Sequence, residues 1–176
     1  MLAKRADELP AGQTWIFEPK WDGFRALIFR DRNEIFMQSR DAKSLNRYFP
    51  ELLEPLRAQL PARCVLDGEI VVAKNEGLDF QELQLRIHPA ASRVKLLSQQ
   101  SPASIVFFDL LCEGNSDWRA EPFERRREKL ASLLASAVRI RGSFWATGTA
   151  PFVAFAMKAG YRHAFKSTNE FVRIKF

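Results

Sequence analysis

Cysteine and histidine are scarce in this chain, with two of each among 176 residues. Cys64 and Cys112 lie far apart and show no metal-binding spacing, which argues against a zinc site and against a disulfide-stapled fold. The first residues lack the apolar core of a secretory signal peptide, and no apolar run is long enough to span a membrane. We therefore expect reduced thiols, a cytoplasmic location and no membrane partner.

The charge balance is basic. Lysine and arginine total 27 against 21 aspartate and glutamate residues, which gives a formal net charge of +6 and a pI of about 9.6. Positive charge favours a polyanionic partner such as nucleic acid or nucleotide, although many basic proteins bind neither. The length and the 47% hydrophobic content allow one domain with a substantial core, or one domain plus a short appendage.

Hydrophobic periodicity predicts a mixture of strands and helices. Strands are predicted near residues 15–17, 24–30, 34–38, 64–73 and 104–111, and helices near 50–60, 79–87, 90–99 and 122–135. Antiparallel strands with the helices kept apart from them indicate an α+β fold.

The segment 18–25 carries the pattern Lys-x-Asp-Gly-x-Arg, with Lys20, Asp22, Gly23 and Arg25 as its fixed residues. Four fixed residues match by chance at about one start site in 10⁵. The pattern is typical of transfer of a nucleoside monophosphate to a lysine amine. Such an amine must lose its proton, and burial or cationic neighbours lower its pKa from about 10.4. Lys20 is thus the candidate nucleophile; the alternative is a solvated lysine in a surface hairpin.

Charged residues interrupt or end other predicted strands. Asp67 and Glu69 lie in an apolar strand, where carboxylates need a cation or hydrogen-bond donors. A metal ion or a ribose would satisfy them, and the alternative is a strand end open to solvent. Asp109 follows an apolar run and Arg40 lies near a strand end. Their simpler interpretations are a strand terminus and a surface salt bridge of little energetic value.

Together these segments resemble the adenylation domain of ATP-dependent DNA ligases, most of all the bacterial ligases of end joining and repair. Four motifs occur in family-like order, at 18–25, 39–52, 65–70 and 106–111. The resemblance implies the ligase nucleotidyltransferase fold, an α+β fold of twisted antiparallel sheets flanked by helices. It places an adenylation domain at residues 1–137 and a divergent tail at 138–176.

The resemblance also implies a nucleotide site and a Mg²⁺ requirement. Lys20 would attack the α-phosphate of ATP to form lysyl-AMP. Glu18 would contact the adenine, and Phe108 would stack on it. Glu69 would bind the ribose or a catalytic Mg²⁺.

The remaining implied roles concern phosphate and DNA. Arg25 and Arg40 would hold phosphate or ribose, a task that suits the fixed fork of the guanidinium group. The AMP would pass to a 5′-phosphate in nicked double-stranded DNA, and the 3′-hydroxyl would then seal the strand. Repair or recombination is the implied process, with end-joining or repair proteins as partners.

The likeness fades in the tail, before the family's fourth motif, its fifth-motif lysines and its OB domain. Residues 170–175 keep Glu170, Val172 and Lys175 at compatible offsets, but Phe171 stands where the family has glycine. This segment is either a degenerate fourth motif or a short terminal strand. We expect a chain truncated before or at the fourth motif, without a complete OB domain, and therefore with weak DNA binding.

The densest basic cluster lies in the helix predicted near 122–135. It is predicted to be a solvated helix face paired with Glu124 and Glu128, with DNA contact as the alternative. Its members are Arg125, Arg126, Arg127 and Lys129.

Two other functional classes stay open. A catalytically inactive remnant would bind nucleotide or DNA without turnover. An RNA ligase or a capping guanylyltransferase would share the Lys-x-Asp-Gly core but use a different substrate.

Overall fold

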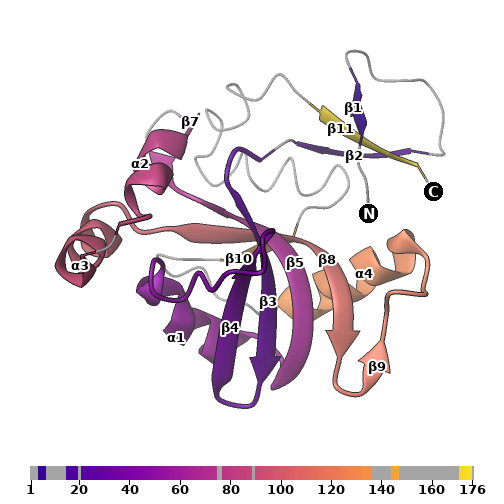
Figure 1. The fold of residues 1–176 in the computed structure, drawn as a ribbon. Helices are drawn as coiled ribbons and strands as arrows, with labels where there is room; N and C mark the ends of the chain where they lie inside the picture. The colour runs from indigo at the N-terminus through magenta and orange to yellow at the C-terminus, as the bar shows by residue number, and fades with distance from the viewer. Residues whose placement is uncertain are drawn as a thin grey trace.

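The computed structural model describes residues 4–6, 15–19, 21–74, 77–88, 90–135, 144–146 and 171–175. Two β-sheets dominate this part of the chain (Figure 1). The larger has six strands in the order β10-β8-β5-β3-β4, with β9 paired to β8, and the smaller has three in the order β1-β11-β2.

The larger sheet carries most of the predicted motifs. All its ladders are antiparallel except the one between β10 and β8. Its strands are β3 (Phe24–Asp31), β4 (Glu34–Ser39), β5 (Arg63–Val71), β8 (Ser104–Glu113), β9 (Ser116–Asp117) and β10 (Phe144–Ala146).

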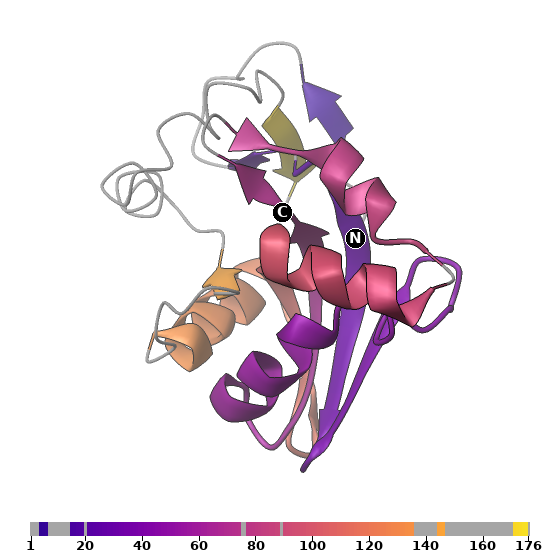
Figure 2. The same cartoon turned by 90° about the vertical axis from the view of Figure 1, so that its left-hand side faces the viewer.

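The helices α1 and α4 cover one face of the larger sheet (Figure 2). Successive side chains of a strand point to opposite faces, so Ala26 and Ile28 of β3 face the helices while Arg25 and Leu27 face away. The helices are α1 (Pro50–Gln59), α2 (Phe80–Leu85), α3 (Ala91–Gln100) and α4 (Phe123–Leu134). Core side chains between sheet and helices include Ile28, Met37, Leu52, Leu56, Leu66, Ile70, Phe107, Leu110 and Leu130.

The smaller sheet lies beyond one end of the larger one (Figure 1). Its strands are β1 (Lys4–Ala6), β2 (Trp15–Pro19) and β11 (Phe171–Lys175), and a separate pair joins β6 (Ala73–Lys74) to β7 (Gly77–Leu78). β2 leads directly toward β3, so the chain passes from the small sheet to the large one through residues 20–23.

These observations confirm the predicted α+β fold and its main elements. Both cysteines are free, and burial raises the pKa of the Cys64 thiol to about 12. The tail contributes backbone to both sheets, since β10 pairs with β8 and β11 pairs with β1 and β2. A terminal strand at 171–175 agrees with both interpretations of that segment, because a fourth motif would also be a strand.

A buried arginine joins the helices to the sheet. Arg86 is 0% exposed and is the largest fully buried side chain among the described residues. Its guanidinium donates hydrogen bonds to the Tyr48 and Ser101 carbonyls and forms an ion pair with Glu51 of α1. The same carboxylate accepts a hydrogen bond from the backbone nitrogen of Ala103, just before β8, at 3.0 Å. One network therefore fixes α1, the end of α2 and the start of β8.

Removing this arginine should destabilise the fold strongly. Arg86→Met leaves the Glu51 carboxylate without its buried cation, so we expect a loss of about 3–5 kcal/mol in the free energy of unfolding. Urea denaturation followed by circular dichroism measures it. Arg57→Met is the control, because the Arg57–Glu54 pair on α1 is exposed and should contribute less than about 1 kcal/mol. Equal losses in the two variants would contradict a structural role for the buried network.

Candidate active site

Three neighbouring strands bring Arg25 and Glu69, two of the predicted site residues, close to two further acids. The register pairs Arg25 of β3 with Glu69 of β5, and Asp67 of β5 with Asp109 of β8. Residues that face each other across a ladder, or lie two positions apart on one strand, share a face of the sheet. Arg25, Asp67 and Glu69 therefore lie on the face opposite the core, and Asp109 of β8 lies next to Asp67, where Arg126 of α4 also reaches it.

Arg25 and Asp67 form a two-point ion pair. Arg25 Nε donates to Asp67 Oδ1 at 3.1 Å and Nη2 donates to Oδ2 at 2.6 Å. The Asp67 side chain is 7% exposed and that of Arg25 is 45% exposed. The Asp67 hydrogen bond raises the pKa of Arg25 further above its ordinary value. The pair is thus buried at its acidic end, while the cation can still reach a ligand.

Glu69 lies beside this pair without such a partner of its own. Burial raises the pKa of its carboxyl to about 7, Arg25 lowers it, and Asp67 and Asp22 add to the rise. Any hydroxyl donor or cation that reaches a buried carboxylate of this kind stabilises its charged form. Asp67 meets its cation within the protein, because Arg25 pairs with it, so a metal ion or a ribose at these acids stays a prediction for Glu69.

Two glycines permit close approach of the strands at this point. A Cβ atom on Gly23 would lie 2.3 Å from the Ile70 carbonyl oxygen and 2.7 Å from Glu69 Cγ. A Cβ atom on Gly68 would lie 2.6 Å from the Val106 carbonyl oxygen. Glycine is therefore required sterically in the Lys-x-Asp-Gly-x-Arg segment and in Asp67-Gly68-Glu69.

Phe108 occupies an irregular position in β8. The register with β5 pairs Gly68 with Phe107 and Asp67 with Asp109, so Phe108 is the extra residue of a β-bulge. The Arg25 guanidinium carbon lies 5.7 Å from the centre of the Phe108 ring, within cation–π range. The bulge thus presents an aromatic ring beside Arg25, the residue that pairs with Asp67.

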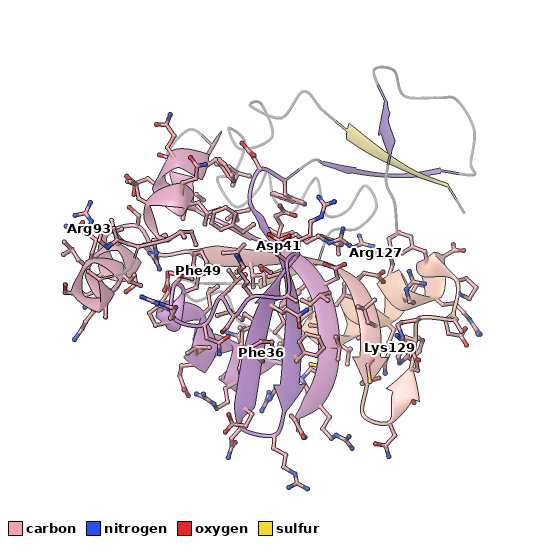
Figure 3. The ribbon with its side chains drawn as sticks, in the orientation of Figure 1. Phe36, Asp41, Phe49, Arg93, Arg127 and Lys129 are labelled. Carbon is pink, nitrogen blue, oxygen red and sulfur yellow. The ribbon has the colours of Figure 1, made fainter. Side chains whose placement is uncertain are left out.

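Sequence reasoning missed the contribution of α4. Arg126 Nε and Nη2 donate to the two carboxylate oxygens of Asp109 at 2.8 and 2.9 Å. Arg127 Nη1 donates to the Phe108 carbonyl at 3.2 Å. Figure 3 labels Arg127, which lies between α4 and the large sheet.

The prediction that the basic residues of α4 form a solvated cluster therefore gave the wrong partners. Arg126 and Arg127 are largely buried against β8, Arg125 pairs with Glu121, and Lys129 pairs with Glu113. One signal was available in the sequence. Arg127 falls on the apolar stripe of the helix, in helical spacing with Phe123, Leu130 and Leu134, where a charged residue needs a buried partner.

The remaining predicted residues lie at the edge of this arrangement. Lys20 lies outside the described residues, between Pro19 at the end of β2 and Trp21. Glu18 lies in β2 opposite Val172 of β11, and Glu170 lies outside the described residues. Arg40 directly follows β4, whose last residue Ser39 pairs with Ala26 beside Arg25. It is exposed and has no ion pair with any described residue.

A groove of about 540 Å³ lies further along the same sheet face. Its floor is apolar, and none of the predicted site residues lines it. Its lining includes Leu27, Phe29, Val65 and Leu111, with Arg63 and Arg119 at the rim.

Metal-ligating side chains do not cluster in the described ranges: no group of three or more His, Cys, Asp or Glu residues there could hold a metal ion. None of the helices in those ranges is long and apolar enough to cross a membrane.

Comparison with known proteins identifies one family. The family model described as "ATP dependent DNA ligase domain" matches residues 1–149. DNA ligase C1 of Mycolicibacterium smegmatis is 53% identical over 140 residues, which cover 76% of this chain and 40% of that protein. DNA ligase C of Mycobacterium tuberculosis is 47% identical over 137 residues, covering 78% of this chain and 38% of that protein. The chain thus spans about two fifths of the length of these relatives.

Solved structures agree with the sequence comparisons. A mycobacterial DNA ligase D complexed with ATP and MES superposes with a TM-score of 0.64 at 25% sequence identity, covering 92% of this chain and 48% of that one. The ligase domain of M. tuberculosis LigD gives a TM-score of 0.63 at 24% identity, which supports the fold. Both findings confirm the predicted ligase-type nucleotidyltransferase fold.

The raised pKa of Glu69 predicts a pH-dependent effect on stability. An acid whose folded-state pKa is about 7, above its ordinary 4.5, destabilises the fold once it ionises. Glu69→Gln removes that cost, so its advantage over the parent should be absent below about pH 4.5, grow between pH 4.5 and pH 7, and level off at about 3 kcal/mol by pH 8.

Chemical denaturation at pH 5 and pH 8 measures this difference. Glu128→Gln, on the exposed face of α4, is the matched control for loss of one carboxylate. An advantage of Glu69→Gln that shrinks as the pH rises, or one that Glu128→Gln reproduces, would contradict the burial of the Glu69 charge.

Proposed function

Because the chain belongs to the ATP-dependent DNA ligase domain family, we propose that it carries the adenylyltransferase activity of a DNA ligase. One observation supports this most directly. The residues of three separate motifs, Arg25, Glu69 and Phe108, lie beside one another on adjacent strands, where the chain arrives from the segment that contains Lys20.

The proposed first step forms a covalent protein–AMP bond. The unprotonated Lys20 amine attacks the α-phosphorus of ATP, a nitrogen–phosphorus bond forms, and the α–β phosphoanhydride bond breaks. Pyrophosphate leaves and the amine loses its proton to solvent. Arg25 lies five residues along the chain, and a nearby cation of this kind favours the neutral amine.

The other site residues would hold the nucleotide. The Phe108 ring offers a stacking surface for the adenine, and Glu18, in the strand before Lys20, would contact the base through its backbone. Arg25 and Arg40 would bind phosphate or ribose oxygens, for which a guanidinium is well shaped. Glu69 would accept a hydrogen bond from the ribose or hold the metal.

The site fits Mg²⁺, which would neutralise the charge that develops on the phosphates. Mg²⁺ keeps several waters and binds through one or two carboxylates together with substrate phosphates. Glu69 meets this need, because its half-buried carboxyl has a raised pKa and no two-point ion pair, whereas Asp67 is already held by Arg25.

The later steps would act on nicked double-stranded DNA. A 5′-phosphate oxygen attacks the phosphorus of lysyl-AMP, the nitrogen–phosphorus bond breaks, and Lys20 is regenerated. The 3′-hydroxyl then attacks the 5′-phosphorus and AMP leaves, which seals the strand. We propose that this reaction serves DNA repair or recombination in the cytoplasm, with end-joining or repair proteins as partners.

The strand β11 is the candidate fourth motif. It pairs antiparallel with β2, and Val172 lies opposite Glu18 in that register. A strand at this position runs beside the one that leads to Lys20. Lys175 would then lie opposite Trp15, at the far end of β2 from Lys20, so it is a weak substitute for a fifth-motif lysine.

Incubation with ATP and Mg²⁺ should add one AMP to the purified chain. Intact-mass spectrometry detects the adduct, once any co-purified AMP has been removed. Lys20→Ala should abolish it, while Lys43→Ala, which removes an exposed lysine after β4, should leave it unchanged. GTP in place of ATP should give no adduct, which separates a DNA ligase from a capping guanylyltransferase.

A folded wild-type chain that forms no adduct would refute the proposed activity. The same result with ATP binding intact would favour the nucleotide-binding remnant.

The purified protein–AMP adduct should transfer its AMP to nicked DNA without added ATP. The expected readout is loss of the AMP mass from the protein and appearance of adenylated or sealed strand on a denaturing gel. A nick with a 5′-hydroxyl is the control, because it lacks the attacking phosphate. Binding of the protein to nicked DNA should weaken steeply as the salt concentration rises, because contacts with the DNA phosphates release counterions. Transfer to neither substrate would restrict this chain to the first step.

A further inference from the structure

We propose that Arg126 and Arg127 of α4 are positioning residues that hold the bulge of β8, and thereby the Phe108 ring, in the geometry that binds the base of ATP. The inference rests on the proposed function, because it takes Phe108 as the surface on which the base stacks. It adds two residues that contact Asp109 and the Phe108 carbonyl, and whose effect on ATP binding should pass through Phe108.

Phe108 needs support because neither described neighbouring strand pairs with it. On one side, the register with β5 passes from Phe107 to Asp109. On the other side, the register with β10 ends at the pair Ala146–Phe107. A bulge disrupts the ladder locally and leaves its extra residue outside the regular pairing. The Phe108 carbonyl instead accepts its hydrogen bond from Arg127 Nη1 at 3.2 Å.

Arg126 holds the residue that follows the bulge. Both carboxylate oxygens of Asp109 accept from its guanidinium, at 2.8 and 2.9 Å, and a third hydrogen bond of 2.6 Å runs from Nη1 to the Glu121 carbonyl. The two side chains are 11% and 6% exposed. Two-point geometry and burial make such a pair far more directional than a surface salt bridge.

The pair also separates two like charges. Asp109 lies directly opposite Asp67 across the β5–β8 ladder, where two carboxylates would repel each other. Arg25 neutralises Asp67 from β3, and Arg126 neutralises Asp109 from α4. Loss of Arg126 would leave the Asp109 charge to compete for Arg25, the same cation that lies over the Phe108 ring.

Phe108 is thus fixed on three sides. Arg127 holds its carbonyl, Arg126 holds the next residue, and Arg25 contacts its ring. Through these contacts α4 supports the part of β8 that carries Phe108. Lys129, on the same helix, pairs with Glu113 at the other end of β8, away from Phe108.

The test measures ATP affinity by calorimetry in the full chain carrying Lys20→Ala, so that no covalent chemistry is required. Arg126→Met should raise the Kd of ATP by about tenfold, the size expected when one member of a coupled network is lost. Arg126→Lys should restore part of this, because it keeps the charge but not the two-point geometry. Lys129→Met, which removes an ion pair from the same helix to the same strand, should leave the Kd unchanged.

Two further measurements separate positioning from loss of folded structure. Inorganic tripolyphosphate lacks a base, so its Kd should not change in Arg126→Met. In a Phe108→Leu background, Arg126→Met should have no further effect on the ATP Kd, because both changes remove the same contact. If Arg126→Met proves too unstable, Asp109→Asn combined with Arg126→Gln removes the buried charges and should still weaken ATP binding, because glutamine cannot make the two-point contact that holds residue 109.

Different results would contradict the inference, the proposed activity or both. An unchanged ATP Kd with a lowered Tm, an equal loss of tripolyphosphate affinity, or additive effects with Phe108→Leu would each overturn the inference. Failure of the wild-type chain to form an AMP adduct, with ATP binding intact, would refute the proposed activity but leave this test in force. Absence of ATP binding in every variant, including the parent, would overturn both.

Discussion

Two carboxylates placed opposite each other in the middle of a sheet are the constraint on which the site depends. Asp67 and Asp109 face each other across β5 and β8 and are almost fully buried. Such an arrangement is stable only if each charge meets its own cation. Arg25 supplies one from β3 and Arg126 supplies the other from α4. The two ion pairs therefore tie a central strand and a covering helix to the same point of the sheet.

This constraint places the candidate chemistry on rigid elements. Arg25, Glu69 and Phe108 lie on strands whose other face packs into the core, and the glycines at 23 and 68 let those strands approach closely. A site built on strands holds its geometry better than one built on loops. Glu69 is not neutralised by a two-point ion pair of this kind. Its raised pKa marks the position where a bound ligand or metal would stabilise the charged carboxylate most.

Much of this could be predicted because the signals are local. Apolar segments identified β3, β5 and β8, and the Lys-x-Asp-Gly-x-Arg pattern identified the candidate nucleophile. The resemblance to DNA ligases agrees with the family match over residues 1–149. The partners of the α4 arginines could not be predicted in the same way. Glu124 and Glu128 are close to them in sequence, but Asp109 and the Phe108 carbonyl lie 17 and 19 residues away.

The fold class, the order of the motifs and the candidate nucleophile could all be predicted, because each depends on residue type and short-range spacing. Which charges neutralise each other, and which residues of β8 bulge from the ladder, depended on how the folded chain packs. A bulge depends on the register between strands that are about 40 residues apart in the chain, and an ion pair depends on where a helix packs. A short stretch of sequence reveals neither the strand register nor the helix packing, so the contact between α4 and Phe108 could not be predicted from it.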